Sequence, residues 1–192
     1  MALTTYIPGE VLTAASLNDN LAYAVTVPAS TPGGLVFISA TTIGSAVGSV
    51  TVSSAFSATY DAYKIVISGG VGSSSNAQIF LTLGATATGY EWAYLLVNSA
   101  STAGSSTTTG TYFPVGEINT NILQGSMEIV NPNLAKYTYA TASLGYNTTN
   151  SNGRAGLTGL LKNTTSYTAF TLTPGAGTLT GGTVRVYGYA NS

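Results

Sequence analysis

The stretch QIFLTL, residues 78–83, decides how this chain folds. Ile79, Leu81 and Leu83 fall on one face of an extended chain and the residues between them fall on the other, because successive side chains of a β-strand point in opposite directions. The alternation of apolar and more polar residues returns in residues 123–129. Both stretches predict strands that bury one face in a core.

The same alternation recurs along the chain from Leu35 onward. Short stretches rich in Gly, Asn and Pro separate the candidate strands, as expected of turns. Many short strands at this spacing predict an all-β fold, an antiparallel β-sandwich of the jelly-roll kind. Besides the two stretches above, the predicted strands are residues 34–40, 48–52, 62–68, 90–97, 138–146, 155–161, 167–173 and 183–189.

The N-terminal segment has a different pattern. Residues 13–24 have helical spacing of apolar residues, and Ser16 with Asp19 three residues later suits a helix N-terminus. Proline and glycine then interrupt the chain up to position 34. We therefore expect two parts: residues 1–33, an extended attachment segment with a short helix and a linker, and residues 34–192, the β-sandwich.

The composition excludes most catalytic chemistry. The chain has no histidine and no cysteine, and only 6% of its residues are charged. Nucleophile pairs that need His or Cys, and the usual zinc and iron ligand sets, are therefore ruled out. We predict no cofactor and no required metal, since the carboxylates form no cluster of the kind that binds calcium.

Charge and hydropathy also limit the partners. The net charge is −1 with five basic residues spread along the chain, which gives no basic patch for nucleic acid. The sequence contains no run of about 20 apolar residues, so we expect no insertion into a membrane. The first residues lack the basic and apolar regions of a secretory signal, so we expect synthesis in a cytosol.

Among the acidic residues, one grouping is worth testing for catalysis. Glu91 lies beside Trp92, and Glu117 or Glu128 could approach it in the fold. Two carboxylates beside an aromatic wall suit a glycosidase, so a polysaccharide-degrading enzyme is an alternative function. The competing interpretation is that each acid is a solvated residue on a strand face.

The closing strand provides a candidate subunit interface. Val184 and Val186 are expected in the core, which leaves Arg185, Tyr187 and Tyr189 on the opposite face. Tyrosine and arginine are enriched at protein interfaces. The alternative is that a neighbouring loop of the same chain covers this strand.

Three stretches of small polar residues are expected to be exposed loops: residues 98–110, 147–153 and 174–182. Such loops on a rigid sandwich are either binding sites or simple connections. The first is the longest, and we take its start as a candidate receptor-facing loop. The residues concerned are Asn98, Ser99, Ser101 and Thr102.

Three stretches carry a resemblance to a known family. The sequence PGEVLTAASLN, residues 8–18, resembles the "PGxxLTAxxLN" opening of tail-fibre and accessory virion proteins of tailed bacteriophages. Residues 56–67 are similar to an "FSxxYxxYxIxI" segment at which a strand begins in phage β-domains, and residues 184–190 add a similar closing strand. The resemblance implies a non-enzymatic exterior virion protein, a trimer whose N-terminal segment attaches and whose sandwich projects. The implied attachment residues are Ile7, Pro8, Leu12, Leu17 and Leu21.

Two roles follow from this resemblance. As a tail-fibre or receptor-binding module, the chain would contact host surface glycan through its loop tips, with Tyr and Trp stacking on sugar rings. As a capsid decoration protein, it would bind between capsid subunits and stabilise the head. In both roles the partners are other virion structural proteins and copies of this chain, and the location is the virion exterior.

Overall fold

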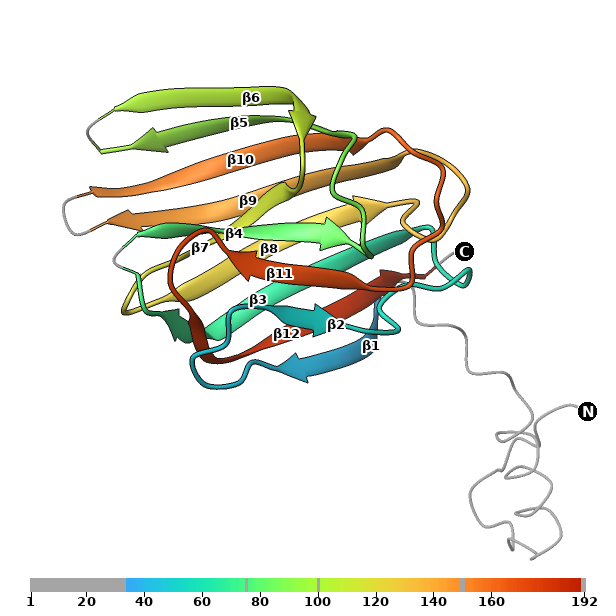
Figure 1. Cartoon of the computed structure of the whole chain (residues 1–192), viewed down its shortest axis with the longest axis horizontal. Coiled ribbons are helices and arrows are strands. Elements are labelled where there is room, and N and C mark those ends of the chain that lie inside the picture. Colours follow the sequence, from blue (N-terminus) through green and yellow to red (C-terminus); the bar gives the residue numbers. More distant parts are fainter. Residues whose placement is uncertain (1–33, 75, 100, 149–150, 191–192) are drawn as a thin grey trace, which may run out of the picture. The chain divides into compact units, whose positions relative to one another are not determined.

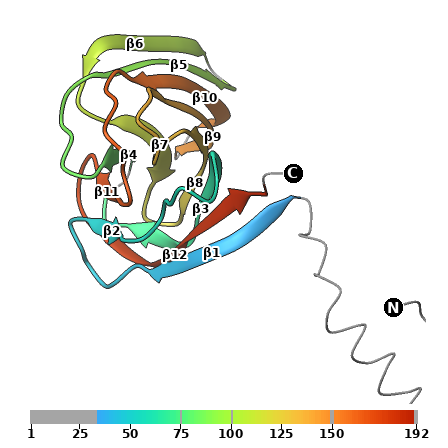
Figure 2. The ribbon, with the colours of Figure 1, turned by 90° about the vertical axis from the view of Figure 1, so that its right-hand side faces the viewer.

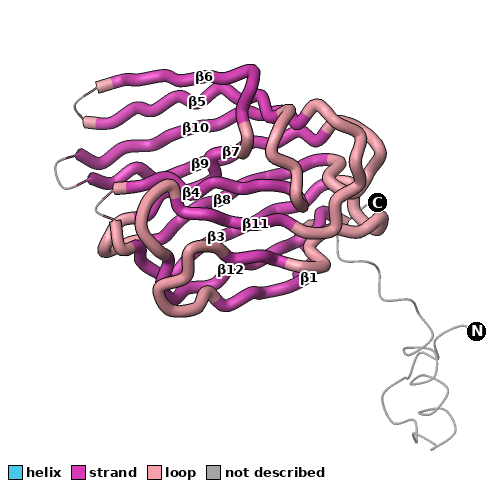
Figure 3. Tube along the Cα trace, viewed as in Figure 1, coloured by secondary structure: helices cyan, strands magenta, loops and turns pink. Residues whose placement is uncertain are grey.

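The computed structural model describes residues 34–74, 76–99, 101–148 and 151–190. Within these ranges the chain forms twelve β-strands, and no residue is helical (Figure 3). The helix expected over residues 13–24 lies outside the described residues.

The strands form two layers in which all neighbours are antiparallel. The larger layer has the order β1-β12-β3-β8-β9-β10-β5-β6, and the smaller has the order β2-β11-β4-β7 (Figure 1). The end of β7 also pairs with the start of β8, which joins the two layers into one continuous sheet. The strands of the larger layer, in that order, are Leu35–Thr42, Leu179–Tyr189, Ala62–Gly72, Leu123–Val130, Thr138–Thr148, Ser151–Leu161, Tyr90–Asn98 and Thr102–Gly110. Those of the smaller layer are Val50–Val52, Phe170–Pro174, Ala77–Leu83 and Phe113–Ile118.

The strand order confirms the predicted jelly-roll sandwich. Four strands of the larger layer, β1-β12-β3-β8, face the smaller layer β2-β11-β4-β7. Among these eight strands, the chain passes from one layer to the other between β1 and β2, β2 and β3, β3 and β4, β7 and β8, β8 and β11, and β11 and β12. This alternation of eight strands between two four-stranded sheets is the jelly-roll arrangement.

Two hairpins are inserted into this framework. Hairpin β5–β6 lies between β4 and β7 in the sequence, and hairpin β9–β10 lies between β8 and β11. The hairpins pair with each other through β10 and β5, and β9 pairs with β8. Together they extend the larger sheet by four strands, which curve over the smaller sheet in the view of Figure 2. We call them the inserted extension.

The core follows the alternation seen in the sequence. Ile79, Leu81 and Leu83 have no exposed surface, and neither do Val184 and Val186 of β12. On each of these strands, every second side chain points to the opposite sheet, because the two layers pack directly on one another.

An aromatic cluster lies where β3 begins. The rings of Phe56 and Tyr63 meet edge to face with centroids 4.9 Å apart, and Tyr60 meets Tyr63 at 6.0 Å. The buried Tyr63 hydroxyl donates to the Ser57 carbonyl at 2.6 Å and accepts from the Ser57 amide at 2.8 Å. The phenol is thus buried with its hydrogen bonds satisfied, which avoids the cost of an unpaired polar group.

The inserted extension also buries the last strand of the smaller sheet. All six residues of β7 are buried, although one face of a sheet strand is usually solvated. The Phe113 ring meets Tyr90 of β5 edge to face at 4.8 Å, and the backbone of Gly159 in β10 lies against the same ring. The extension therefore packs on β7 as part of the core.

The three loops predicted from the sequence are too long, because strands occupy part of each predicted stretch. Residues 102–110 form strand β6 along β5, strands β9 and β10 reach residues 148 and 151, and β12 begins at residue 179. Residues 102–110 lack an alternation of apolar and polar residues, and the strand forms because pairing with β5 satisfies its backbone groups. Strand β7 was not predicted at all, because its residues show no alternation of polar and apolar types.

Substitutions of two glycines on β10 test the packing of the extension. A Cβ added at Gly159 would lie 2.6 Å from Cε1 of Phe113, whereas a Cβ at Gly156 would meet nothing within 4 Å. We expect Gly159→Ala to lower the free energy of unfolding by about 1–3 kcal/mol through overpacking. The control Gly156→Ala should change it by no more than about 0.5 kcal/mol, as for surface sites.

Urea unfolding of both variants measures the difference. Equal unfolding midpoints for the two variants would contradict the described packing of β10 on β7.

Candidate functional site

The sandwich has two dissimilar ends. At one end the described chain begins and finishes, and the Ala190 amide donates to the Gly34 carbonyl at 2.9 Å. At the opposite end lie the ends of β3, β5, β7 and β9 and the starts of β4, β6, β8 and β10, which follow them in the sequence (Figure 1). We call these the terminal end and the turn end.

The turns at the turn end are linked to one another. The Gly72 amide donates to the Asn119 carbonyl at 2.8 Å, which joins the β3–β4 connection to the β7–β8 turn. Asn98 pairs with Gly153, which joins the two inserted hairpins. The strand ends at the turn end are thus paired with one another in two groups.

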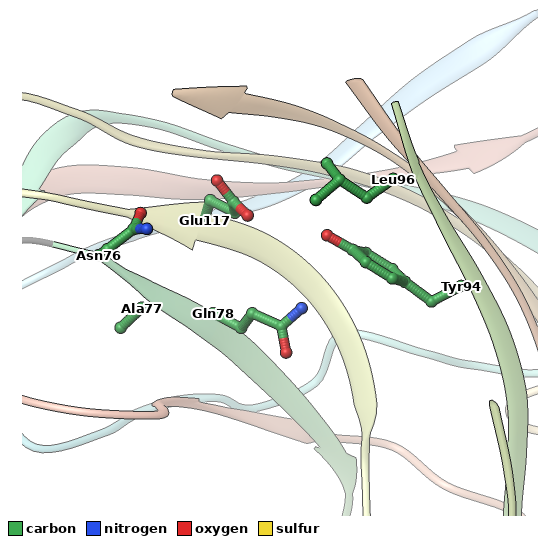
Figure 4. A pocket seen from close by; sticks show the side chains of 6 residues that line it. All are labelled: Asn76, Ala77, Gln78, Tyr94, Leu96 and Glu117. Atoms are coloured by element: carbon green, nitrogen blue, oxygen red, sulfur yellow. The ribbon is translucent and has the colours of Figure 1, made fainter. Parts of the chain in front are cut away.

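A groove of about 270 Å³ opens at the turn end, between the smaller sheet and the inserted extension. Its side chains come from the start of β4, the second half of β5 and the end of β7 (Figure 4). The lining residues are Asn76, Ala77, Gln78, Tyr94, Leu96 and Glu117.

The strand registers explain how these side chains converge. Gln78 pairs with Glu117, so the two side chains lie on the same face of the smaller sheet, opposite to buried Ile79. On β5 the alternation turns Tyr94 and Leu96 toward that face and leaves their neighbours outward. In Figure 4 the Tyr94 hydroxyl points from β5 toward Glu117.

The chemistry of the groove is mixed. Glu117 is only 5% exposed and provides carboxylate oxygens, while Asn76 and Gln78 provide both amide donors and acceptors. Tyr94 and Leu96 provide apolar surface, and the Tyr94 phenol is a further donor and acceptor. Of these residues, the sequence analysis identified only Glu117 as a candidate functional residue. The sequence did not indicate the others, because they come together only through the packing of the inserted extension.

The candidate interface residues lie on the outer face of the larger sheet, as predicted. Arg185 donates from Nη1 to Ser68 Oγ at 3.1 Å, and the Tyr187 ring meets Phe37 edge to face at 5.8 Å. The Tyr189 hydroxyl donates to a carboxylate oxygen of Glu128 at 2.6 Å. All three residues remain partly exposed, between β1 and β3. Contact with another subunit stays a prediction.

The bond between Tyr189 and Glu128 changes both ionisations. It raises the pKa of Tyr189 to about 12, and it lowers the pKa of Glu128, to which the Lys64 ammonium at 3.3 Å also contributes. The carboxylate and the neutral phenol are therefore the stable pair at neutral pH.

Exposed apolar side chains mark two further areas that the sequence analysis missed. Leu35 and Phe37 on edge strand β1 are 51% and 58% exposed, and Leu95 with Val97 lies on the outer face of β5. Alternation alone did not reveal them, because in both strands the residues on the other face are apolar as well.

The candidate receptor-facing residues lie at the turn end, where β5 ends at Asn98 and β6 begins at Thr102, and not in a long loop. The Asn98 amide donates to the Ser101 carbonyl at 2.9 Å, and the Ser101 amide donates to Asn98 Oδ1 at 2.7 Å. Ser99 is exposed, and Thr102 is the first residue of β6.

The structure does not bring the three candidate catalytic carboxylates together. Glu91 faces outward from β5 and pairs with Lys162 at 2.8 Å, while Trp92 points to the opposite face. Glu128 is three strand positions away from β5, roughly 14 Å at the usual strand spacing. Glycosidase carboxylates lie about 5–9.5 Å apart. Glu117 faces the groove on the other side of β5 from Glu91.

The remaining expectations concern attachment and metals. Ile7, Pro8, Leu12, Leu17 and Leu21 lie outside the described residues. Within the described ranges, no three His, Cys, Asp or Glu side chains gather as a metal site would require. In the same part of the chain there is no helix of the length and hydropathy that a membrane span needs.

Comparison with known proteins identifies no family. No family description and no curated protein matches the sequence. Among solved structures, the tripod BppUct-A-L from the baseplate of bacteriophage Tuc2009 is similar at a TM-score of 0.23 and 13% identity, over 100% of this chain and 99% of that one. This likeness is too low to carry an argument, so function is argued from the residues of this chain.

Substitution of Tyr189 tests its bond to Glu128. Because the bond lowers the pKa of Glu128, its contribution to stability is present above the ordinary glutamate pKa of 4.5 and is lost as pH falls through the lowered value. We expect Tyr189→Phe to reduce the free energy of unfolding at pH 7 by at most about 1 kcal/mol, since the pair is exposed. At pH 3 the difference from the wild-type chain should shrink.

Urea unfolding at pH 3 and pH 7 measures the difference in the free energy of unfolding between Tyr189→Phe and the wild-type chain. On the alkaline side the contribution is complete below pH 10 and is lost as pH rises through about 12, where Tyr189 ionises. A difference between variant and wild type that is the same at pH 3 and pH 7 would refute the assignment.

Proposed function

We propose that this chain is a non-enzymatic structural protein on the exterior of a tailed-phage virion. Within that class we propose a receptor-binding type of module, anchored by residues 1–33 and presenting its sandwich outward. The N-terminal sequence PGEVLTAASLN supports the class through its resemblance to virion attachment segments.

The observation that carries the proposal is the separation of the two ends of the sandwich. The described chain begins at Gly34 in the terminal end, directly after residues 1–33 in the sequence, and the ends of the hairpin strands lie at the other end (Figure 1). Strands that run between the two ends form a rigid spacer. A module attached through its terminal end therefore presents its turn end to the surroundings.

The charge distribution supports a role in binding and not in catalysis. Glu91 and Glu128 both lie on the outer face of the larger sheet but three strand positions apart, and Glu117 faces the groove. The chain also has no His or Cys to act as base or nucleophile. A net charge of −1 also provides little repulsion between copies, which favours assembly.

We propose that the assembly is a homotrimer with other virion proteins as its partners. The outer face near the terminal end supplies suitable contact residues, with Leu35 and Phe37 exposed on β1 beside Tyr187 and Tyr189 of β12. Exposed apolar and tyrosine side chains that lie together are typical of subunit contacts.

Capsid decoration is the second candidate function. The same exposed Leu35 and Phe37 lie one to three residues after Gly34, so a capsid surface bound by the anchoring segment would also meet them. In that role the sandwich would lie against the head and the buried area would stabilise it.

Immunogold labelling of intact virions with antibody against the sandwich distinguishes these functions. We expect gold on the tail, because a receptor-binding module must reach the host. Particles grown without the chain are the control. Gold over the head would instead favour decoration, and an absence of label on all surfaces would overturn an exterior role.

A further inference from the structure

We infer that the groove at the turn end binds one sugar unit of a neutral saccharide. The inference rests on the proposed function, for which it names the ligand class and the site. The groove is formed by Tyr94 and Leu96 of the inserted extension and by Gln78 and Glu117 of the smaller sheet (Figure 4).

The polar groups of the groove match a ligand that carries many hydroxyls. A sugar hydroxyl both donates and accepts a hydrogen bond, and the groove has acceptors in Glu117 and mixed donors and acceptors in Gln78 and Asn76. Buried hydrogen bonds to a carboxylate are stronger than those between neutral groups. The 5% exposed Glu117 is therefore the residue with the largest expected contribution to orientation.

The apolar groups of the groove match the C–H face of a sugar ring. Tyr94 and Leu96 are consecutive inward residues of β5, so their side chains form a continuous apolar wall beside the polar groups. A tyrosine combines a flat apolar ring with a polar tip, as an amphipathic ligand requires.

The charge of the groove selects against anionic ligands. Of the described lining residues, one is acidic and none is basic. A phosphate or an acidic sugar would place a negative charge beside the Glu117 carboxylate at low dielectric, where like charges repel strongly. A calcium ion in turn prefers six to eight oxygens with several carboxylates, and the groove offers one carboxylate.

The size and place of the groove agree with a single sugar unit. Its volume of about 270 Å³ is close to the lower end of the usual range for small-molecule sites, about 300–1,000 Å³. It opens beside the turns that face away from the terminal end. A longer glycan bound there would have its remaining units outside the groove, next to the Asn98 turn on β5.

Binding of defined sugars to the full-length chain tests the inference. The probes are the methyl glycosides of D-glucose, D-galactose, L-rhamnose and N-acetyl-D-glucosamine, with D-glucuronic acid and N-acetylneuraminic acid as anionic comparisons. Saturation-transfer NMR detects the contacts and titration calorimetry gives the affinity. We expect at least one neutral probe to bind, and both anionic probes to bind at least tenfold more weakly.

Variants place the bound sugar in the groove. Glu117→Gln keeps the shape of the side chain and removes its charge, Tyr94→Ala removes the ring, and Tyr94→Phe removes only the hydroxyl. We expect the first two to weaken binding by at least tenfold and Tyr94→Phe to weaken it less. The matched control is Glu91→Gln, a carboxylate on the outer face of β5, which should bind as the wild-type chain does.

Circular dichroism and the midpoint of urea unfolding show whether each variant is folded. If Tyr94→Ala does not fold, the affinity of Glu117→Gln for the sugar decides whether the groove is the binding site. No binding of any neutral probe, unchanged affinity in Glu117→Gln, or tighter binding of an anionic probe would each overturn the inference.

Cell binding separates this inference from the proposed function. If the wild-type chain and Glu117→Gln bind host cells equally, the receptor-binding function stands and the groove assignment fails. If the wild-type chain does not bind cells, the receptor-binding function fails, and the sugar titration still decides whether the groove binds saccharide.

Discussion

The packing of the inserted extension on β7 is the interaction on which the rest of the structure depends. Without it, β7 would be an ordinary last strand of the smaller sheet with one face in water. Tyr90 fastens the extension to β4, because its buried hydroxyl accepts from the Leu83 amide at 2.8 Å and donates to the Thr86 carbonyl at 3.2 Å. Burial of this phenol raises its pKa to about 12, which keeps it neutral and able to donate.

The groove is a geometric result of that packing. Gly159 lets β10 approach the Phe113 ring closely, and farther along β5 the groove lies between Tyr94 and Gln78. The layers are thus in contact near the starts of β5 and β7, and the groove lies toward the turn end. The jelly roll supplies a rigid support, while the insertions supply the candidate site, in agreement with the general rule that function resides in sites added to a fold.

Neutrality is the second constraint on this molecule. Few charges and no disulfide mean that durability must come from strand pairing, from the core and from association with neighbours. The few charged residues are used locally: Glu128 joins Lys64 of β3 and Tyr189 of β12 across the outer face, and Lys162 joins Glu91. None of these surface pairs alone contributes much to stability.

The sequence by itself determined the all-β class, the jelly-roll sandwich and part of the core. Ile79, Leu81, Leu83, Val184 and Val186 were predicted to be buried from alternation alone, because a strand that packs on one side must alternate. The outward direction of Tyr187 and Tyr189 followed from the same rule.

Only the tertiary structure decided which strands are neighbours. Strand β6 has no apolar pattern and exists because β5 lies beside it, and β7 has no alternation because both of its faces are covered. The groove joins residues of β4, β5 and β7, whose partners are chosen by long-range pairing. The alternation of residue types indicates which face of a strand is buried, but it carries no information about which other strand buries that face. The candidate site therefore could not be predicted from the sequence.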